Sequence, residues 1–235
     1  ETVSGTVEDI RINIHYLPDH RPAAEAALTF TIDAINAFTE YYGPYVYNEL
    51  DVVETHTAAG GIEYPGLIVV ASDFWEADDF FLQVITVHEV AHQWWYSMVG
   101  NDQVTYPWLD EALTDYSVAQ YFRYINGDEW YEGTIQNFAE QFTNYEETAP
   151  AEQIGEPTSG YTQEAYAPIV YRKGAFFFHI ISETIGMPAL LEALQTYLAS
   201  YRYGIATAFD LQTAMEAAAG QELDELFLEW VGYSN

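Results

Sequence analysis

Cysteine, basic residues and long apolar runs are what this 235-residue sequence lacks. The absence of cysteine excludes disulfides, thiol nucleophiles and cysteine-based metal sites. Only 6 residues are Lys or Arg, and because phosphate binding depends on clustered Lys and Arg side chains, nucleic acid is excluded as a partner. No apolar run reaches the roughly 18 residues that a membrane-spanning helix needs, so no membrane-spanning segment is expected. The start of the chain has no signal-peptide pattern either, and localisation is left open.

Acidic residues, in contrast, number 37, and the formal net charge is −31. Two interpretations stay open: a solvated surface that keeps the protein soluble, and adaptation to high salt, which the presence of a single lysine, Lys173, favours. Composition of this kind bears on solubility and association rather than on the fold. Apolar residues make up 49% of the chain and aromatic residues 17%, which is enough for a packed core and excludes wholesale disorder.

The first 75 residues contain both strand and helix patterns. Apolar and polar side chains alternate over residues 10–16, which predicts a half-buried strand. A helix is predicted from Asp19–Pro22 to Gly43-Pro44, because proline favours the first turn of a helix and Gly-Pro ends one. Two more strands are predicted over 45–55 and 67–71. These patterns predict a small mixed α/β lobe over residues 1–75.

Helical patterns follow one another from Asp78 and Asp79 onward, where two acids favour a helix N-terminus. A central helix over 80–99, expected to end at Gly100, is apolar nearly all round, as a buried helix is. Further helices are predicted over 107–125, 128–145, 163–185, 188–201, 207–219 and 222–231, with a loop over 148–162. The predicted fold is therefore α+β, with a mainly helical lobe over 76–235 following the mixed lobe in a single domain, 1–235.

The central helix contains the run His88-Glu89-Val90-Ala91-His92. Residues four apart lie on one face of a helix, so both imidazoles can reach a single ion with Glu89 beside it. Neutral imidazoles suit Zn²⁺, which in a catalytic site has three protein ligands and one open position for water. A pair of helix histidines packed in a core is the alternative, because so short a pattern also occurs by chance.

Glu111, nineteen residues after His92, is the candidate for the third ligand. It lies in the first turns of the next predicted helix, where an antiparallel neighbour would return its carboxylate to the metal. Asp115, one turn later on the same face, can accept a hydrogen bond from a ligand imidazole and fix its tautomer. A solvated helix carboxylate is the alternative for Asp115. The remaining histidines have no ligand-type spacing and are expected to be structural or exposed: His15, His20, His56 and His179.

Two further stretches complete a set of four motifs. The first is Gly60-Gly61-Ile62-Glu63-Tyr64, whose Glu63 precedes His88 by 25 residues. The second is Tyr171-Arg172-Lys173-Gly174, within the helix predicted over 163–185. With the HEVAHQWW run from His88 and the WLDE run ending at Glu111, they resemble the aminopeptidase-N family of gluzincin metallopeptidases, which also includes leukotriene A4 hydrolase. That family has G-x-M-E-N at the first stretch and Y-x-K-G at the second, so Ile62 and Tyr64 depart from its pattern. The resemblance covers most of the chain.

The resemblance implies a thermolysin-like zinc-peptidase domain that holds one Zn²⁺ through His88, His92 and Glu111. It implies that Glu89 is the general base, which takes a proton from water and passes it to the leaving amine. Tyr171 would donate a hydrogen bond to the oxyanion that forms on the substrate. Tyr166 is a weaker candidate for the same pocket.

The stretch from Gly60 to Tyr64 implies exopeptidase action. A carboxylate fixed beside the metal, that of Glu63, can pair with a free α-ammonium group, so that only the first peptide bond is placed for hydrolysis. Gly60 and Gly61 would let the backbone approach the substrate closely, as an edge strand does when it pairs with a peptide. An ordinary Gly-Gly turn before a strand is the alternative.

The expected function is that of a zinc-dependent aminopeptidase, which hydrolyses the N-terminal bond of peptides with a free N-terminus by metal-activated water. Two alternatives remain: a gluzincin that acts on interior peptide bonds or on an epoxide, and a non-catalytic relative used as a scaffold. Family members normally carry a β-rich domain before this region and often a helical domain after it, and neither is in these 235 residues. We therefore interpret the chain, which starts at Glu1, as a processed protein or an excised catalytic domain. The preferred N-terminal residue and the oligomeric state are left open.

Overall fold

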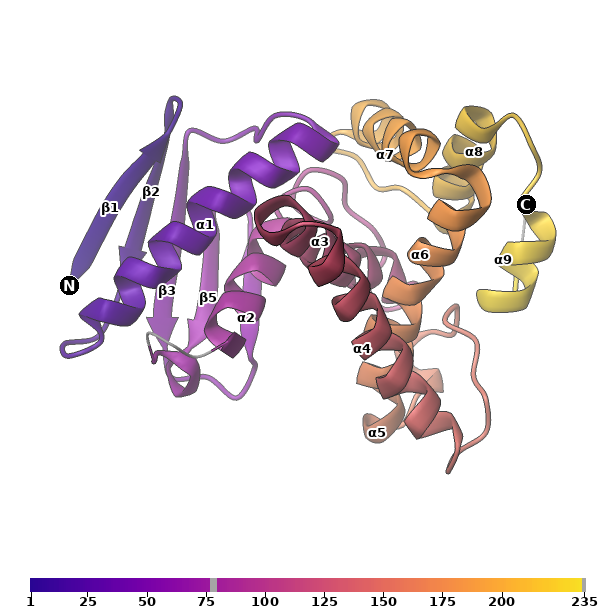
Figure 1. Cartoon of the computed structure of the whole chain (residues 1–235), viewed down its shortest axis with the longest axis horizontal. Coiled ribbons are helices and arrows are strands. Elements are labelled where there is room, and N and C mark those ends of the chain that lie inside the picture. The colour runs from indigo at the N-terminus through magenta and orange to yellow at the C-terminus, as the bar shows by residue number, and fades with distance from the viewer. Residues whose placement is uncertain (77–79, 234–235) are drawn as a thin grey trace. The chain divides into compact units, whose positions relative to one another are not determined.

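The computed structural model describes residues 1–76 and 80–233 and divides into two compact units, Glu1–Ser97 and Met98–Asn235. The first unit contains a mixed sheet with two long helices, and the second is helical (Figure 1). The predicted α+β class is confirmed. That the two units form a single catalytic domain stays a prediction.

Five strands form the sheet, in the order β1-β2-β3-β5-β4. Their bounds are Thr2–Val7 (β1), Ile10–His15 (β2), Glu49–Thr55 (β3), Gly61–Tyr64 (β4) and Leu67–Ala71 (β5). The central strands β2, β3 and β5 are parallel, whereas the edge strands β1 and β4 are antiparallel to their neighbours. The three predicted strands are confirmed as β2, β3 and β5. Strand β1 escaped prediction because Gly5 interrupts its apolar side, where a Cβ would lie only 3.3 Å from the side chains of Leu28 and Ile32.

Two helices, α1 (Arg21–Tyr42) and α2 (Phe80–Ala91), cover one face of this sheet (Figure 1). Helix α1 packs on β1 and β2, α2 packs on β4 and β5, and the two helices pack on each other. These contacts assign α2 to the first unit, whereas the sequence placed it at the start of a helical lobe from residue 76. The apolar side chains beneath the helices are fully buried: Ile12, Ile14, Leu50, Val52, Ile68 and Val70.

The observed end of α1 agrees with the prediction from the sequence, whereas that of α2 does not. Helix α1 ends before Gly43, as predicted. The prediction that the central helix continues to residue 99 is wrong, because α2 ends at Ala91 and the chain reverses at Tyr96, whose φ is +109°. The side chain of Gln93 is drawn into the sheet, where it accepts from the Gly66 amide and donates to the Tyr64 carbonyl. The predicted helix start at Asp78 and Asp79 lies outside the described residues.

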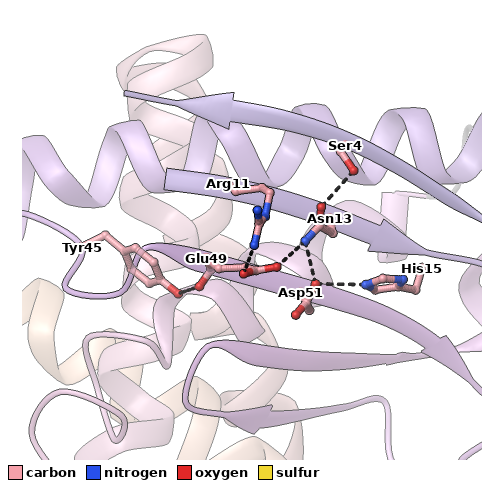
Figure 2. A network of polar contacts seen from close by, with 7 residues as sticks. All are labelled: Ser4, Arg11, Asn13, His15, Tyr45, Glu49 and Asp51. Carbon is pink, nitrogen blue, oxygen red and sulfur yellow. Dashed lines mark hydrogen bonds and ion pairs between the residues drawn. The ribbon is translucent and has the colours of Figure 1, made fainter. Parts of the chain in front are cut away.

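The other face of the sheet carries a polar network across β1, β2 and β3 (Figure 2). Asn13 is at its centre, since its Nδ2 donates to Glu49 (2.7 Å) and to Asp51 (2.9 Å) and its Oδ1 accepts from Ser4 (2.9 Å). At the ends of the network, Arg11 forms an ion pair with Glu49, and Nε2 of His15 lies 2.9 Å from the Asp51 carboxylate. The amide of Asn13 therefore separates two carboxylates that would otherwise repel each other.

Replacing Asn13 with Asp is expected to lower the free energy of unfolding by about 1–2 kcal/mol, because it removes two donors and adds a third carboxylate. The loss is expected to shrink in 1 M NaCl, where the screening length falls to about 3 Å. Denaturant unfolding at low and high salt measures both effects. Asn137→Asp is the matched control, because it adds the same charge at an exposed position and keeps the oxygen that accepts from Gln141. Equal losses in the two variants would contradict the prediction.

The second unit contains seven α-helices within its described residues: α3 (Trp108–Asn126), α4 (Asp128–Glu146), α5 (Gln163–Tyr166), α6 (Gly174–Ile185), α7 (Met187–Tyr201), α8 (Ala208–Ala219) and α9 (Asp224–Trp230). Helix α3 is the core element, because it packs on both α4 and α6 and most of its residues are buried. Helices α7 and α8 pack side by side (Figure 1). The predicted helices of this region are confirmed, with one exception.

The exception is the helix predicted over 163–185. A π-helical segment, Ala167–Lys173, interrupts it between α5 and α6. Pro168 explains the interruption, because proline has no N–H for an α-helical hydrogen bond and its ring clashes with the preceding turn. The Gly174 amide accordingly donates to the carbonyl of Ile169, five residues earlier.

Among residues 1–76 and 80–233, no single helix has both the length and the apolar character needed to cross a membrane. Only Gln163–Ile185 and Met187–Tyr201 taken together meet the criteria of length and composition, and these two segments are bent by 119°.

Candidate active site

The candidate site residues are divided between the two units. The first unit contains Gly60, Gly61, Glu63, His88, Glu89 and His92, and the second contains Glu111, Asp115 and Tyr171.

The two histidines lie at the C-terminal end of α2, with ring centroids 4.9 Å apart. His92 follows the last α2 residue and continues the helical turn, because its amide donates to the His88 carbonyl. Its ring is buried, and Nδ1 lies 3.0 Å from the carbonyl oxygen of Trp95. A carbonyl oxygen can only accept, so Nδ1 carries a proton, and in the neutral ring Nε2 is then the nitrogen without one. This is the tautomer that a metal ligand needs, and it is held in place by the reversal of the chain after α2.

Glu89 is only 5% exposed and lies against the edge strand β4. A Cβ at Gly61 would overlap the carboxylate of Glu89 and lie 2.6 Å from its Cγ. Gly60 is different, because within the described part of the chain a Cβ there would meet only Ile85, at an ordinary 3.8 Å. Gly61 therefore leaves room for the carboxylate of Glu89, and the predicted approach of Gly60 and Gly61 to the substrate stays a prediction.

Glu63 lies on the helix-covered face of β4, because it pairs with Ile68 across the sheet. One ligand atom from each of Glu63, Glu89 and His92 lies within 4.8 Å of the others. Two carboxylates this close repel each other unless a cation or a proton lies between them. The first unit thus brings together two carboxylates and an imidazole, which are kinds of group that bind Zn²⁺.

In the second unit, Glu111 lies in the first turn of α3 and accepts a hydrogen bond from the Tyr171 hydroxyl. Burial, and then the charge of Glu111, raise the pKa of Tyr171 well above its usual value. Burial and Glu111 also raise the pKa of Tyr166, whose ring centroid is 5.9 Å from that of Tyr171. Tyr171 therefore keeps its proton and can act as a donor, and Tyr166 lies beside it.

Asp115, predicted to orient a ligand imidazole, forms a buried ion pair with Arg172. The imidazole contact stays a prediction. The sequence motifs gave Arg172 no role. Its signal was that a basic residue, rare in this acidic chain, directly follows Tyr171. Gln93 was missed as well, and its signal was a polar side chain in an otherwise apolar run.

The remaining histidines serve the structure or face solvent, as predicted. His15 pairs with Asp51 (2.9 Å) and His20 with the buried Glu54 (2.7 Å). The other two differ from these in having no acidic partner in the described contacts: His179 contacts the Tyr131 hydroxyl, and His56 is exposed.

Comparison with known proteins identifies the family. Residues 26–230 match the Peptidase family M1 domain. The chain is 24% identical to Aminopeptidase M1 of Arabidopsis thaliana and 25% identical to Aminopeptidase M1-C of Oryza sativa subsp. japonica, in each case over 96% of this chain and 27% of the relative. It is also 25% identical, over 86% of its length and 28% of the relative, to Probable aminopeptidase 2 of Sulfurisphaera tokodaii. The chain thus spans about a quarter of the length of these relatives.

A solved structure shares the fold of this chain. The chain is similar to the crystal structure of an M1 zinc metallopeptidase mutant from Deinococcus radiodurans, with a TM-score of 0.73 and 16% identity over 98% of this chain and 52% of that one. The chain therefore belongs to peptidase family M1, and its resemblance to the aminopeptidase-N group of metallopeptidases is confirmed.

Proposed function

We propose that this chain is the catalytic domain of a zinc aminopeptidase, which hydrolyses the N-terminal bond of peptides with a free amino group. The observation that carries the proposal is the convergence of Glu63, Glu89 and His92 in the first unit. It combines the carboxylate proposed to bind the substrate amine (Glu63), the carboxylate proposed as base (Glu89) and an imidazole proposed as metal ligand (His92). Membership of family M1 and the names of its aminopeptidase relatives support the same activity.

The proposed ligands of one Zn²⁺ are His88, His92 and Glu111. The contact of His92 Nδ1 with the Trp95 carbonyl supports this assignment, since metal-binding histidines commonly donate their other ring N–H to such an oxygen. Spacing supports the assignment as well, because His88 and His92 are four residues apart and therefore neighbours on one helix face. Glu111 lies in the first turn of α3. When bound, zinc lowers the pKa of a water molecule and polarises the scissile carbonyl.

Glu89 is the proposed general base. Its buried carboxylate takes a proton from the attacking water and gives it to the amine that leaves. Because Gly61 has no side chain, this carboxylate can lie against β4, so its position depends on the strand as well as on α2. A fixed base needs no reorientation during the reaction, which is the advantage of placing it on rigid elements.

Tyr171 is the proposed donor to the substrate carbonyl oxygen as that oxygen gains negative charge. Its raised pKa supports this role, because a tyrosine that stays protonated can donate throughout the working pH range. Glu63 is the proposed partner of the α-ammonium group of the substrate. Strand β4 is an edge strand, so Gly60 and Gly61 leave a backbone edge with which an extended peptide can pair.

The proposal predicts that a dipeptide amide with a free amine is hydrolysed, that its N-acetylated form is not, and that chelation stops the reaction. Glu63→Gln is expected to lower kcat/KM for the free-amine substrate by about 10- to 100-fold, from the ~1.5–3 kcal/mol of a charge-assisted hydrogen bond. It is expected to leave zinc content unchanged. Steady-state kinetics and metal analysis measure these quantities.

Glu40→Gln, at an exposed position of α1, is the matched control and is expected to behave like the wild type. Equal hydrolysis of the acetylated substrate would favour a peptidase of interior bonds. Purified protein without zinc and without turnover would favour a scaffold.

A further inference from the structure

Arg172 follows Tyr171 directly and is one of only 6 basic residues in the chain. The two side chains reach two positions on α3. The Tyr171 hydroxyl donates to Glu111, and the Arg172 guanidinium donates through Nη1 to Asp115. Glu111 and Asp115 are four residues apart and therefore lie on one face of α3.

The π-helical segment makes this double contact possible. A π-helix has more residues in each turn than an α-helix, so neighbouring side chains diverge less and both can face α3. The backbone also approaches α3 closely, because a Cβ at Gly174 would lie 2.5 Å from the Cβ of Ala112. Ala112 itself lies between Glu111 and Asp115 in sequence. The segment is thus pressed onto the part of α3 that carries the proposed ligand.

Arg172 is held by more than its ion pair. Its Nε donates to Gln141 on α4 (3.2 Å), and its guanidinium lies over the ring of Phe138, 5.4 Å from the centroid. The Arg172 side chain is 26% exposed and that of Asp115 only 3%. A guanidinium held at three points is a rigid group, and its loss would leave the carboxylate of Asp115 buried without this cation.

We infer that Arg172 is a positioning residue for Tyr171: its ion pair with Asp115 fixes the π-helical segment so that the Tyr171 hydroxyl stays on the side of Glu111. The inference rests on the catalytic role proposed for Tyr171. It assigns Asp115 a second partner and a different purpose from the orientation of an imidazole. Arg172 acts only through its neighbour.

A double-mutant cycle tests the inference. Arg172→Ala is expected to lower kcat by about 10- to 100-fold with KM within about 2-fold and zinc retained, because a shift of the donor by about 1 Å has effects of this size. Arg172→Lys keeps the charge without the fork and is expected to lie between Arg172→Ala and the wild type. In the Tyr171→Phe background, Arg172→Ala is expected to change kcat by less than about 2-fold, because the group being positioned is already lost.

Arg123→Ala is the matched control. Arg123 also forms an ion pair with an aspartate, Asp128, and its guanidinium lies 5.1 Å from the centroid of the Tyr131 ring. The control loses the same kinds of contact at the other end of α3, and its kcat is expected to equal that of the wild type. If Arg172 had only a structural role, Arg172→Ala would lower thermal stability, as Arg123→Ala would. The kcat of the folded Arg172→Ala protein would then equal that of the wild type.

A further loss of kcat in the Tyr171→Phe background equal to that in the wild type would overturn the inference. The crystal structure of Arg172→Ala, or of Arg172→Lys if the first does not fold, gives a decision that does not depend on activity. The Tyr171 hydroxyl is expected to have left the Glu111 carboxylate, and an unchanged position refutes the inference. Absence of turnover in the wild type, or full activity of Tyr171→Phe, would count against the proposed function instead.

Discussion

Replacement of Glu89 by Gln is expected to lower kcat by about 10²–10⁴-fold, the usual contribution of a general base, while zinc stays bound. The amide has the size of the carboxylate and fits the space that Gly61 leaves, but it cannot take a proton at neutral pH. Metal content is expected to be unchanged, because Glu89 is not among the proposed ligands. The measurements are kcat with a free-amine dipeptide and the zinc content of the purified variant.

Glu54→Gln is the control for the general effect of removing a buried carboxylate. Glu54 and Glu89 are both 5% exposed and both lie in the first unit. Glu54 accepts from the Leu17 amide and pairs with His20, so its replacement is expected to lower stability and to leave kcat unchanged. A near-normal kcat for Glu89→Gln would remove Glu89 from the mechanism. Loss of zinc from that variant would make Glu89 a ligand instead of a base.

The addition of one methyl group at Gly61 is expected to have the second largest effect. In Gly61→Ala the new Cβ overlaps the carboxylate of Glu89, which is the flexible end of a side chain and can move away. The fold is therefore expected to survive with a small change in Tm, whereas kcat falls about 100-fold because the base is displaced by about 1 Å or more. Thermal unfolding and steady-state kinetics on the same preparation separate the two effects.

Gly60→Ala is the matched control, since among the described residues its Cβ would meet only Ile85, at 3.8 Å. It is expected to keep both Tm and kcat. Gly61→Ala is also expected to add little to Glu89→Gln, because both variants impair the same group. Equal activity of Gly60→Ala and Gly61→Ala would show that the position of Glu89 does not depend on the missing side chain.

The elements whose form depends on local sequence were predicted well. Helix α1 follows a clear helical pattern between Pro22 and Gly43, and β2 alternates at every position. The pairing of His88 and His92 could be predicted for the same reason, because a spacing of four residues places both rings on one face of any α-helix. The tautomer of His92 could not, because it depends on where the chain places the carbonyl of Trp95 after it leaves the helix.

Two local predictions were wrong in part, one because of a tertiary contact and the other because of a proline. The apolar run after Ala91 has the composition of a longer helix, but Gln93 binds the backbone of the β4–β5 hairpin and the chain turns away. The stretch around Pro168 looks helical and is helical, but the hydrogen bonds shift to a π pattern that the motif alone did not reveal. In both places a polar or proline residue within an apolar run was the visible signal.

By itself the sequence determined the family, three of the five strands, most of the helices and the residue types that could bind a metal, since these depend on composition and on spacing along a few turns of chain. Tertiary structure alone decided that Gly61 makes room for the carboxylate of Glu89 and that Arg172 pairs with Asp115, 57 residues away. The physical reason is that the partner of a buried charge is set by which segments pack together. No local pattern records that choice.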